Sequence, residues 1–119
     1  MMVQRGDIVL VDFPYSDRSG SKVRPSLVVQ GDHNNRRLDD TIVVLISTNT
    51  QRADREPAQL LIDITTPEGQ QSGLLHPSAV QCENIVTIDC QFIGRKIGSL
   101  SPALMQRIDN CLKASLGIS

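Results

Sequence analysis

The chain has 119 residues, of which 13 are Asp or Glu and 12 are Lys or Arg, giving a formal net charge of −1. This length suits one hydrophobic core, so we expect a single domain over residues 1–119. The balanced charge excludes binding of duplex nucleic acid by charge alone. With one Tyr, two Phe and no Trp, the chain also has too few rings for several base-stacking platforms.

The sequence contains no apolar run near the ~18 residues that a membrane span needs. Arg5 and Asp7 flank a glycine close to the N-terminus, where a secretory signal would be apolar after its first charges. We therefore expect a cytoplasmic protein that does not associate with a membrane.

The cysteines and histidines form no recognisable site. Cys82, Cys90 and Cys111 are odd in number and form no C-x-x-C motif. In a reducing compartment this usage is typical of small apolar core residues. His33 and His76 lie far apart and have no neighbours at ligand spacing. We therefore predict no bound metal and no cofactor.

Six short segments have the apolar, β-branched composition or the alternation that is typical of strands. They span residues 4–13, 24–30, 41–47, 58–64, 73–82 and 85–89. The first carries apolar residues on both faces, which predicts a strand buried on both sides. Polar composition predicts loops over 14–21 and 31–40 and a charged, mobile segment over 51–57.

The chain is expected to end in a helix. After a turn predicted by Pro and Gly over 65–69, Ser101 is a suitable N-cap and Pro102 a suitable first helical residue. Gly117 is a suitable stop. One apolar face is formed by Leu104, Ile108, Cys111 and Leu112. Six short strands, polar loops and one closing helix predict a mostly β protein with α, a small and strongly curved antiparallel barrel.

Arg24 lies where a cationic loop runs into an apolar strand. Pro25 has a fixed φ and disfavours a helical conformation at the residue before it, so Arg24 is extended at the start of the strand. A guanidinium on a rigid strand suits a phosphate, because its planar fork keeps its charge and binds oxygens in pairs. The alternative interpretation is an exposed residue at the end of a strand.

Three polar clusters interrupt the strands, at residues 15–24, 47–50 and 81–84. Each adjoins an apolar strand, so a barrel could bring all three to one rim. None contains a G-x-S-x-G elbow, a phosphate-binding Gly-Lys loop or a metal-binding spacing. Because turns are polar in all proteins, the clusters by themselves define no activity.

Four motifs follow one another in a familiar order. They are Arg5-Gly-Asp-Ile-Val, Gly20-Ser-Lys-Val-Arg-Pro-Ser-Leu-Val-Val, Thr41-Ile-Val-Val-Leu-Ile-Ser-Thr-Asn and Cys82-Glu-Asn-Ile-Val-Thr-Ile-Asp. In this order the chain resembles the MazF/PemK-type toxins of bacterial toxin–antitoxin systems, from Arg5 to the C-terminal helix. The resemblance implies an SH3-like barrel, usually a homodimer. Such a toxin cuts single-stranded RNA at short sequences without a metal and is silenced by a cognate antitoxin.

The resemblance also implies roles for particular residues. Arg24 matches the arginine at the cleaved phosphate, where it would stabilise the charge that develops as the 2′-hydroxyl attacks. The expected products are a 2′,3′-cyclic phosphate and a 5′-hydroxyl. Ser47 aligns with the family's threonine at the end of the third strand, and Thr48 is the reserve candidate. The expected RNA contacts are Tyr15, Arg18, Lys22, Thr48, Asn49, Gln81, Glu83 and Asn84.

The chain departs from some family members at three positions. Val86 stands where many carry Arg, and Gln81 and Glu83 stand where some carry an Arg–Asp pair. Glu83 is then the one nearby carboxylate that could take the 2′-proton, or alternatively a solvated turn residue. A different function is also open: a non-catalytic toxin of the same barrel family that binds DNA gyrase. That function needs an exposed, specialised end on the C-terminal helix, and residues 116–119 show no sign of one.

Overall fold

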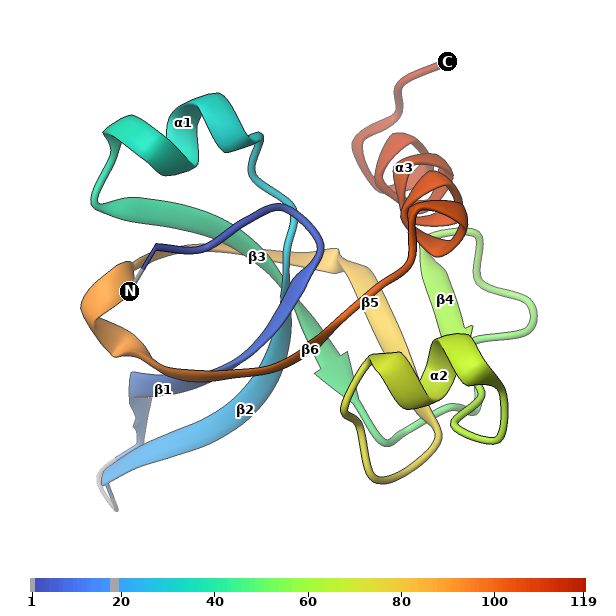
Figure 1. Cartoon of the computed structure of the whole chain (residues 1–119). Helices are drawn as coiled ribbons and strands as arrows, with labels where there is room; N and C mark the ends of the chain where they lie inside the picture. The colour runs from blue at the N-terminus through green and yellow to red at the C-terminus, as the bar shows by residue number, and fades with distance from the viewer. Residues whose placement is uncertain (1, 18–19) are drawn as a thin grey trace.

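The computed structural model of the protein describes residues 2–17 and 20–119. The elements in chain order are β1 (Asp7–Asp17), β2 (Gly20–Val28), α1 (Asp32–Arg37), β3 (Asp40–Ser47), β4 (Gln59–Ile62), α2 (Pro67–Gln71), β5 (Ser78–Asp89), the 3-10 turn η1 (Cys90–Phe92), β6 (Ile93–Ser99) and α3 (Pro102–Leu116) (Figure 1). Within the described residues the strands form one antiparallel sheet in the order β4-β5-β3-β2-β1-β6. The sheet is strongly curved, with α2 and α3 on one side and α1 on the other (Figure 1). The predicted fold class is confirmed.

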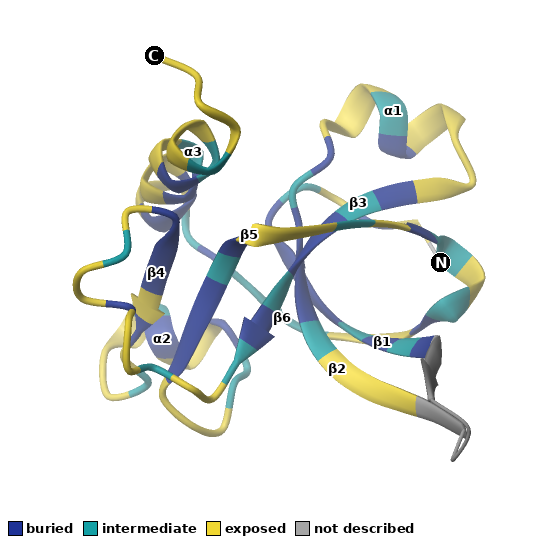
Figure 2. Cartoon of the chain, turned by 180° about the vertical axis from the view of Figure 1, so that it is seen from behind, coloured by how far each residue is buried: buried dark blue, intermediate teal, exposed yellow. Residues whose placement is uncertain are grey.

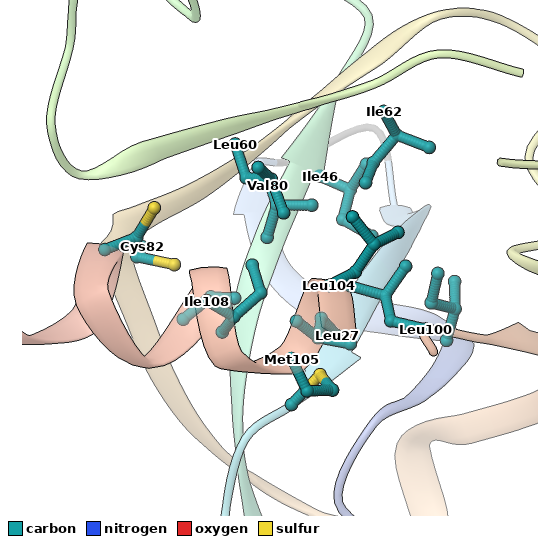
Figure 3. Close-up of a cluster of buried hydrophobic side chains, with 13 residues drawn as sticks. Leu27, Ile46, Leu60, Ile62, Val80, Cys82, Leu100, Leu104, Met105 and Ile108 are labelled. Atoms are coloured by element: carbon teal, nitrogen blue, oxygen red, sulfur yellow. The ribbon is translucent and has the colours of Figure 1, made fainter. Parts of the chain in front are cut away.

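Two clusters of buried side chains lie on opposite faces of the strands. In the first, Leu104 and Ile108 of α3 pack over apolar side chains of the sheet (Figure 3). The second lies between the curled strands themselves. β1 supplies Ile8 to the first cluster and Val9 and Val11 to the second. This confirms that the strand is buried on both faces.

The predicted C-terminal helix is confirmed together with both of its ends. The Ser101 hydroxyl oxygen accepts a hydrogen bond from the Leu104 N–H at 3.2 Å, as expected of an N-cap. Gly117 has φ 70° and donates its N–H to the Lys113 carbonyl oxygen, which is the usual left-handed C-terminal arrangement. The helix is buried toward the sheet and exposed outward (Figure 2). No helix in the described ranges is long and apolar enough to span a membrane.

The Arg5-Gly-Asp motif has a structural role. The Arg5 Nη2 group lies 2.6 Å from Asp109 Oδ1 on α3, and its Nε donates to the Val29 carbonyl oxygen at 2.9 Å. Gly6 has φ 98°, and the buried Asp7 accepts the Gln4 N–H at 2.9 Å. The motif therefore ties the start of β1 to the end of β2 and to the closing helix.

Residues 14–17 and 20–21 of the segment predicted to be a loop belong to two paired strands. β1 continues to Asp17 and β2 begins at Gly20. Pairing runs from Phe13 with Lys22 to Asp17 with Gly20, with a register shift between the two pairs. The prediction was wrong because ladder hydrogen bonds join backbone groups, and polar side chains do not prevent them.

The polar connection predicted over 31–40 contains a helix, α1. Its Asn35 is buried, donates to the Gln30 carbonyl oxygen at 3.0 Å and accepts from the Thr41 hydroxyl at 2.8 Å. These partners, on either side of the helix, satisfy a buried amide. The polar composition alone gave no sign of them, so the segment resembled a loop.

The turn predicted over 65–69 opens a second short helix, α2. The Thr66 hydroxyl oxygen accepts a hydrogen bond from the Gly69 N–H at 3.0 Å, which caps the first turn. The strand predicted over 58–64 exists but is shorter, as β4. In both places the element was expected and its boundary differs.

The two strands predicted over 73–82 and 85–89 are one strand, β5, which begins only at Ser78. β6 was missed altogether. Its sequence, Ile-Gly-Arg-Lys-Ile-Gly-Ser, has two glycines and two cations and no clear alternation. It is a strand because β1 offers it a partner along its whole length, for example Lys96 opposite Val9.

Candidate functional site

Arg24 and Ser47 lie on neighbouring strands, β2 and β3, where the ladder between these strands ends. The last pair of that ladder is Ser26 with Leu45, and Arg24 and Ser47 each lie two residues beyond it on their own strands. Side chains two positions apart in a strand point to the same face, so Arg24 and Ser47 leave the sheet on the side of Ser26 and Leu45. Arg24 is exposed and Ser47 is half-buried, so both are open to a ligand.

The Ser47 hydroxyl is oriented by the turn that follows β3. Its oxygen accepts a hydrogen bond from the Asn49 N–H at 3.0 Å, and the Asn49 side-chain oxygen accepts from the Gln51 N–H at 3.2 Å. A hydroxyl has one proton to donate and two lone pairs. Because Asn49 occupies a lone pair, the Ser47 proton stays available for a phosphate oxygen.

Two glutamines continue this face across β5 and β4. Gln81 pairs with Leu45, and Gln59 pairs with Gln81. Since each pair shares a face, and Leu45 shares a face with Ser47, both glutamines lie on the face of Arg24 and Ser47. They are level with Leu45, two residues before Ser47 on β3. The structure therefore brings the predicted contact Gln81 together with the predicted catalytic pair.

A bulge in β5 carries the other two polar residues of this cluster. Residues 82–84 are additional to the β3–β5 ladder, which passes from Gln81 to Ile85 without a partner for them. The Glu83 Oε2 atom accepts from Gln59 Nε2 at 2.7 Å, and Asn84 Nδ2 donates to Gln81 Oε1 at 2.7 Å. A bulge re-aims side chains next to a strand, and here both are held by glutamines of the same face.

These side chains line a polar cavity of about 340 Å³, which we call the amide cavity. Its residues are Asn49, Gln51, Arg52, Gln59, Gln81, Glu83 and Asn84. Side-chain amides both donate and accept, Arg donates and Glu accepts, so together they match the hydrogen-bonding edges of nucleobases. Four of the predicted RNA contacts meet here: Asn49, Gln81, Glu83 and Asn84.

The other predicted contacts lie elsewhere. Thr48 lines a different cavity, together with Pro25. Lys22 is exposed on β2, two residues before Arg24. Tyr15 belongs to β1, but its side chain is not described, and Arg18 lies outside the described residues.

Sequence reasoning missed three residues of the amide cavity: Gln51, Arg52 and Gln59. The first two fall in the segment 51–57, which was interpreted as a mobile connection. It forms turns in which the Ala53 N–H donates to the Thr50 carbonyl oxygen at 3.2 Å. Gln59 was missed because the strand over 58–64 was identified from its apolar face alone. The residues on the opposite face of that strand, Gln59 among them, were the available signal.

Thiol chemistry does not contribute to the site. Burial, followed by the nearby Cys111 and Glu83, raises the pKa of Cys82 to about 12. Burial also raises the pKa of Cys111 and of Cys90. All three thiols therefore stay protonated at neutral pH, and a thiol is a weak nucleophile. Among the described residues no group of three His, Cys, Asp or Glu side chains could hold a metal ion.

Residues 4–116 match the family described as PemK-like, MazF-like toxin of type II toxin-antitoxin system. The chain belongs to this family. It is 34% identical to the endoribonuclease EndoA of Bacillus subtilis (strain 168), covering 99% of this chain and 97% of that protein. It is 30% identical to the endoribonuclease MazF of Staphylococcus epidermidis, covering 99% and 94%.

Solved structures share the fold at lower sequence identity. A mycobacterial endoribonuclease in complex with its cognate antitoxin has a TM-score of 0.77 and 23% identity, covering 98% of this chain and 97% of that one. A MazE-MazF structure from Deinococcus radiodurans has a TM-score of 0.76 and 13% identity, covering 100% of both chains. At such identities the likeness concerns the fold alone.

Proposed function

We propose that this protein is the endoribonuclease toxin of a type II toxin–antitoxin system and cleaves single-stranded RNA at short sequences, inhibiting translation. The observation that supports the proposal is that Arg24 and Ser47 lie on neighbouring strands, each two residues beyond the last pair of the β2–β3 ladder and on one face of the sheet. The relatives named as endoribonucleases, at 30% and 34% identity over nearly the whole chain, support the same activity.

In the proposed reaction the RNA supplies its own nucleophile. The 2′-oxygen forms a bond to phosphorus, the bond from phosphorus to the 5′-oxygen breaks, and a 2′,3′-cyclic phosphate and a 5′-hydroxyl result. Arg24 stabilises the developing negative charge with its paired N–H donors. Ser47 donates a hydrogen bond from its hydroxyl group to a phosphate oxygen. No metal or cofactor takes part in this scheme.

Glu83 is the proposed acceptor of the 2′-proton. The Gln59 Nε2 donor fixes its Oε2 atom at 2.7 Å, and a carboxylate retains further lone pairs on both oxygens. The leaving 5′-oxygen takes its proton from water. Val86 packs half-buried against the second core cluster, which supports a structural role at a position where other family members carry Arg.

The amide cavity is the proposed site for reading bases next to the cut. We further propose that the protein acts in the cytoplasm as a homodimer and is neutralised by a cognate antitoxin. Membership of a family described as toxins of type II toxin-antitoxin systems supports the last point. Lys22, close to Arg24 on β2, is proposed to bind the RNA backbone, as are Tyr15 and Arg18.

The proposal is tested by incubating purified protein with total RNA in EDTA and mapping any cuts by primer extension. The account predicts discrete cuts at one short sequence in the presence of the chelator, and none with the Arg24→Ala variant. Intact RNA, together with inhibited supercoiling by gyrase, would instead support the gyrase-binding alternative.

A further inference from the structure

A second cavity, of about 600 Å³, lies beside Arg24 and Ser47, which we call the cleavage pair, and has no role in the mechanism above. We call it the leucine cavity. Its lining comes from β1, β2, β6, the residue after β3, the segment between α2 and β5, and the first residue of β5. It comprises Leu10, Pro25, Thr48, Gly73, Leu74, Leu75, His76, Ser78, Arg95, Lys96 and Ile97.

The wall of this cavity is held rigidly against β6. Gly73 has φ 76°, and a Cβ atom there would lie 2.0 Å from the Ile97 carbonyl oxygen. A Cβ atom on Gly98 would lie 2.3 Å from the Ser72 carbonyl oxygen. Two glycines thus let two backbone segments touch where side chains would separate them. The cavity is therefore formed before any ligand arrives.

The lining has an apolar floor and an apolar lip. Leu10 and Ile97 are half-buried in the floor, whereas Leu75 is 82% exposed at the lip. A single exposed leucine is ordinary on a protein surface, but this one borders a cavity that is also lined by the apolar side chains of Leu10, Leu74 and Ile97. A flat, largely apolar ring, such as a nucleobase, fits between a floor and a lip of this kind.

The charge of the lining fits a phosphate. Arg95 and Lys96 are both cations, and the imidazole of His76 adds a further possible hydrogen-bond donor. None of the described residues that line the cavity is a carboxylate. Lys96 Nζ lies 3.1 Å from Asp7 Oδ1, whereas Arg95 has no ion pair within the described part of the chain. In a chain with a net charge of −1, this local excess of cations favours an anionic ligand.

The leucine cavity begins one residue after each member of the cleavage pair. Pro25 follows Arg24 on β2, Thr48 follows Ser47 just beyond the end of β3, and both line the cavity. Because successive residues of a strand point to opposite faces, Pro25 sets the cavity on the face of β2 opposite to Arg24. An RNA strand that passes over this part of the sheet therefore meets the cavity next to the cleaved phosphate.

We propose that the leucine cavity binds a nucleotide that neighbours the cleaved linkage, with the base between Leu10 and Leu75 and its phosphate on Arg95. This inference rests on the proposed function and adds a second recognition site to the amide cavity. It also gives Thr48 a binding role that is distinct from the role of Ser47.

The test measures binding of a fluorescent heptanucleotide RNA that carries a 2′-deoxy nucleotide at the mapped cut, and so is not cleaved by the proposed reaction. If no cut is found, a mixed-sequence heptanucleotide pool replaces it. Leu75→Ser and Arg95→Ala are compared with Arg37→Ala, which removes the same charge from exposed α1 on the far side of the molecule. Leu75 and Arg95 are exposed, so these variants should fold normally.

We expect Kd to rise about tenfold in Leu75→Ser, because apolar contact with the base is lost, and about tenfold in Arg95→Ala, because a charged hydrogen bond to the phosphate is lost. Arg95→Ala should also lower the slope of log Kd against log salt by about 0.7, the share of one phosphate on a single strand. Arg37→Ala should change neither quantity. Replacing the base next to the cut with an abasic site should abolish the effect of Leu75→Ser.

Unchanged Kd values in both variants would overturn the inference. So would a loss confined to antitoxin binding or to self-association, which would assign the cavity to a protein partner. Cleavage of the all-ribose RNA is measured separately in the same variants. Normal cleavage with unchanged RNA binding in these variants would overturn only the inference about the leucine cavity. Absence of cleavage by the wild-type protein would overturn the proposed function.

Discussion

Ser47→Ala is expected to abolish most RNA cleavage while leaving the fold intact. Ser47 is half-buried at the end of β3, and the hydroxyl makes one hydrogen bond within the described chain, from the Asn49 N–H at 3.0 Å. Loss of that bond in a solvated turn costs about 1 kcal/mol of stability at most. Loss of a phosphate donor costs about 10²–10³ in kcat, or about 2.7–4 kcal/mol of transition-state stabilisation. The catalytic effect should therefore far exceed the effect on folding.

Two neighbouring variants make this prediction specific. Ser47→Thr returns a hydroxyl at the same position, on a strand where a β-branched residue is favourable, and should restore most of the rate. Thr48→Ala removes a hydroxyl that lies in the leucine cavity, and should weaken binding without lowering kcat. The assay is cleavage of one short RNA, with circular dichroism to verify folding. An inactive Thr48→Ala protein beside an active Ser47→Ala protein would refute the reasoning.

Three further predictions concern the site and its scaffold. Arg24→Lys keeps the charge but loses the paired donors, so kcat should fall at least about 100-fold with unchanged melting temperature; near-normal cutting would remove Arg24 from the mechanism. Gly73→Ala should lower the free energy of urea unfolding by more than about 2 kcal/mol, because its φ is 76° and its Cβ would overlap Ile97. Gly117→Ala, at φ 70° with open space around it, is the matched control and should cost about 1 kcal/mol; equal costs would contradict the structure. Burial raises the pKa of Cys82 from 9.0 to about 12, so the thiol keeps its proton to a higher pH in the folded state than in the unfolded state. The free energy of unfolding should therefore fall as pH rises above about 9. Cys82→Ala should show a shallower fall between pH 8.5 and 10.5, and identical slopes would count against a buried thiol.

The fold could be predicted where local pattern and tertiary role agree. α3 has a capping serine, a proline at its first position, one apolar face and a terminal glycine, and all four signals lie within the helix itself. The strand of Arg24 was also recognised from Pro25 and the apolar run behind it, but Arg24 is not at its start, because β2 begins four residues earlier, at Gly20. In both cases a local sequence preference and the burial pattern point to the same structure.

The sequence concealed elements that depend on distant partners. β6 is a strand because β1 pairs with it, although its own residues include two glycines and two cations. α1 depends on the buried amide of Asn35, whose partners lie before and after the helix. The β1–β6 pairing joins segments far apart in sequence and cannot be recovered from a short window, whereas the partners of Asn35 lie only five and six residues away, in a segment whose polar composition resembled a loop.

The candidate site divides in the same way. Arg24, Ser47 and Gln81 were named from motifs, and the strand register sets them on one face. Gln59 was missed because its contact with Glu83 joins residues 24 positions apart across a bulge. The leucine cavity was missed because it requires Gly73 to lie against Ile97 of β6, and no local motif predicts a contact between segments so far apart in the sequence.

The most direct test of the proposed chemistry uses two short RNAs that differ only in the 2′-hydroxyl at the mapped cut. With wild-type protein in EDTA, the all-ribose RNA should be cut to a fragment ending in a 2′,3′-cyclic phosphate, identified by its mass, and the 2′-deoxy RNA should remain intact. Cleavage of the 2′-deoxy RNA, or a product ending in a 3′-hydroxyl and a 5′-phosphate, would contradict attack by the 2′-hydroxyl.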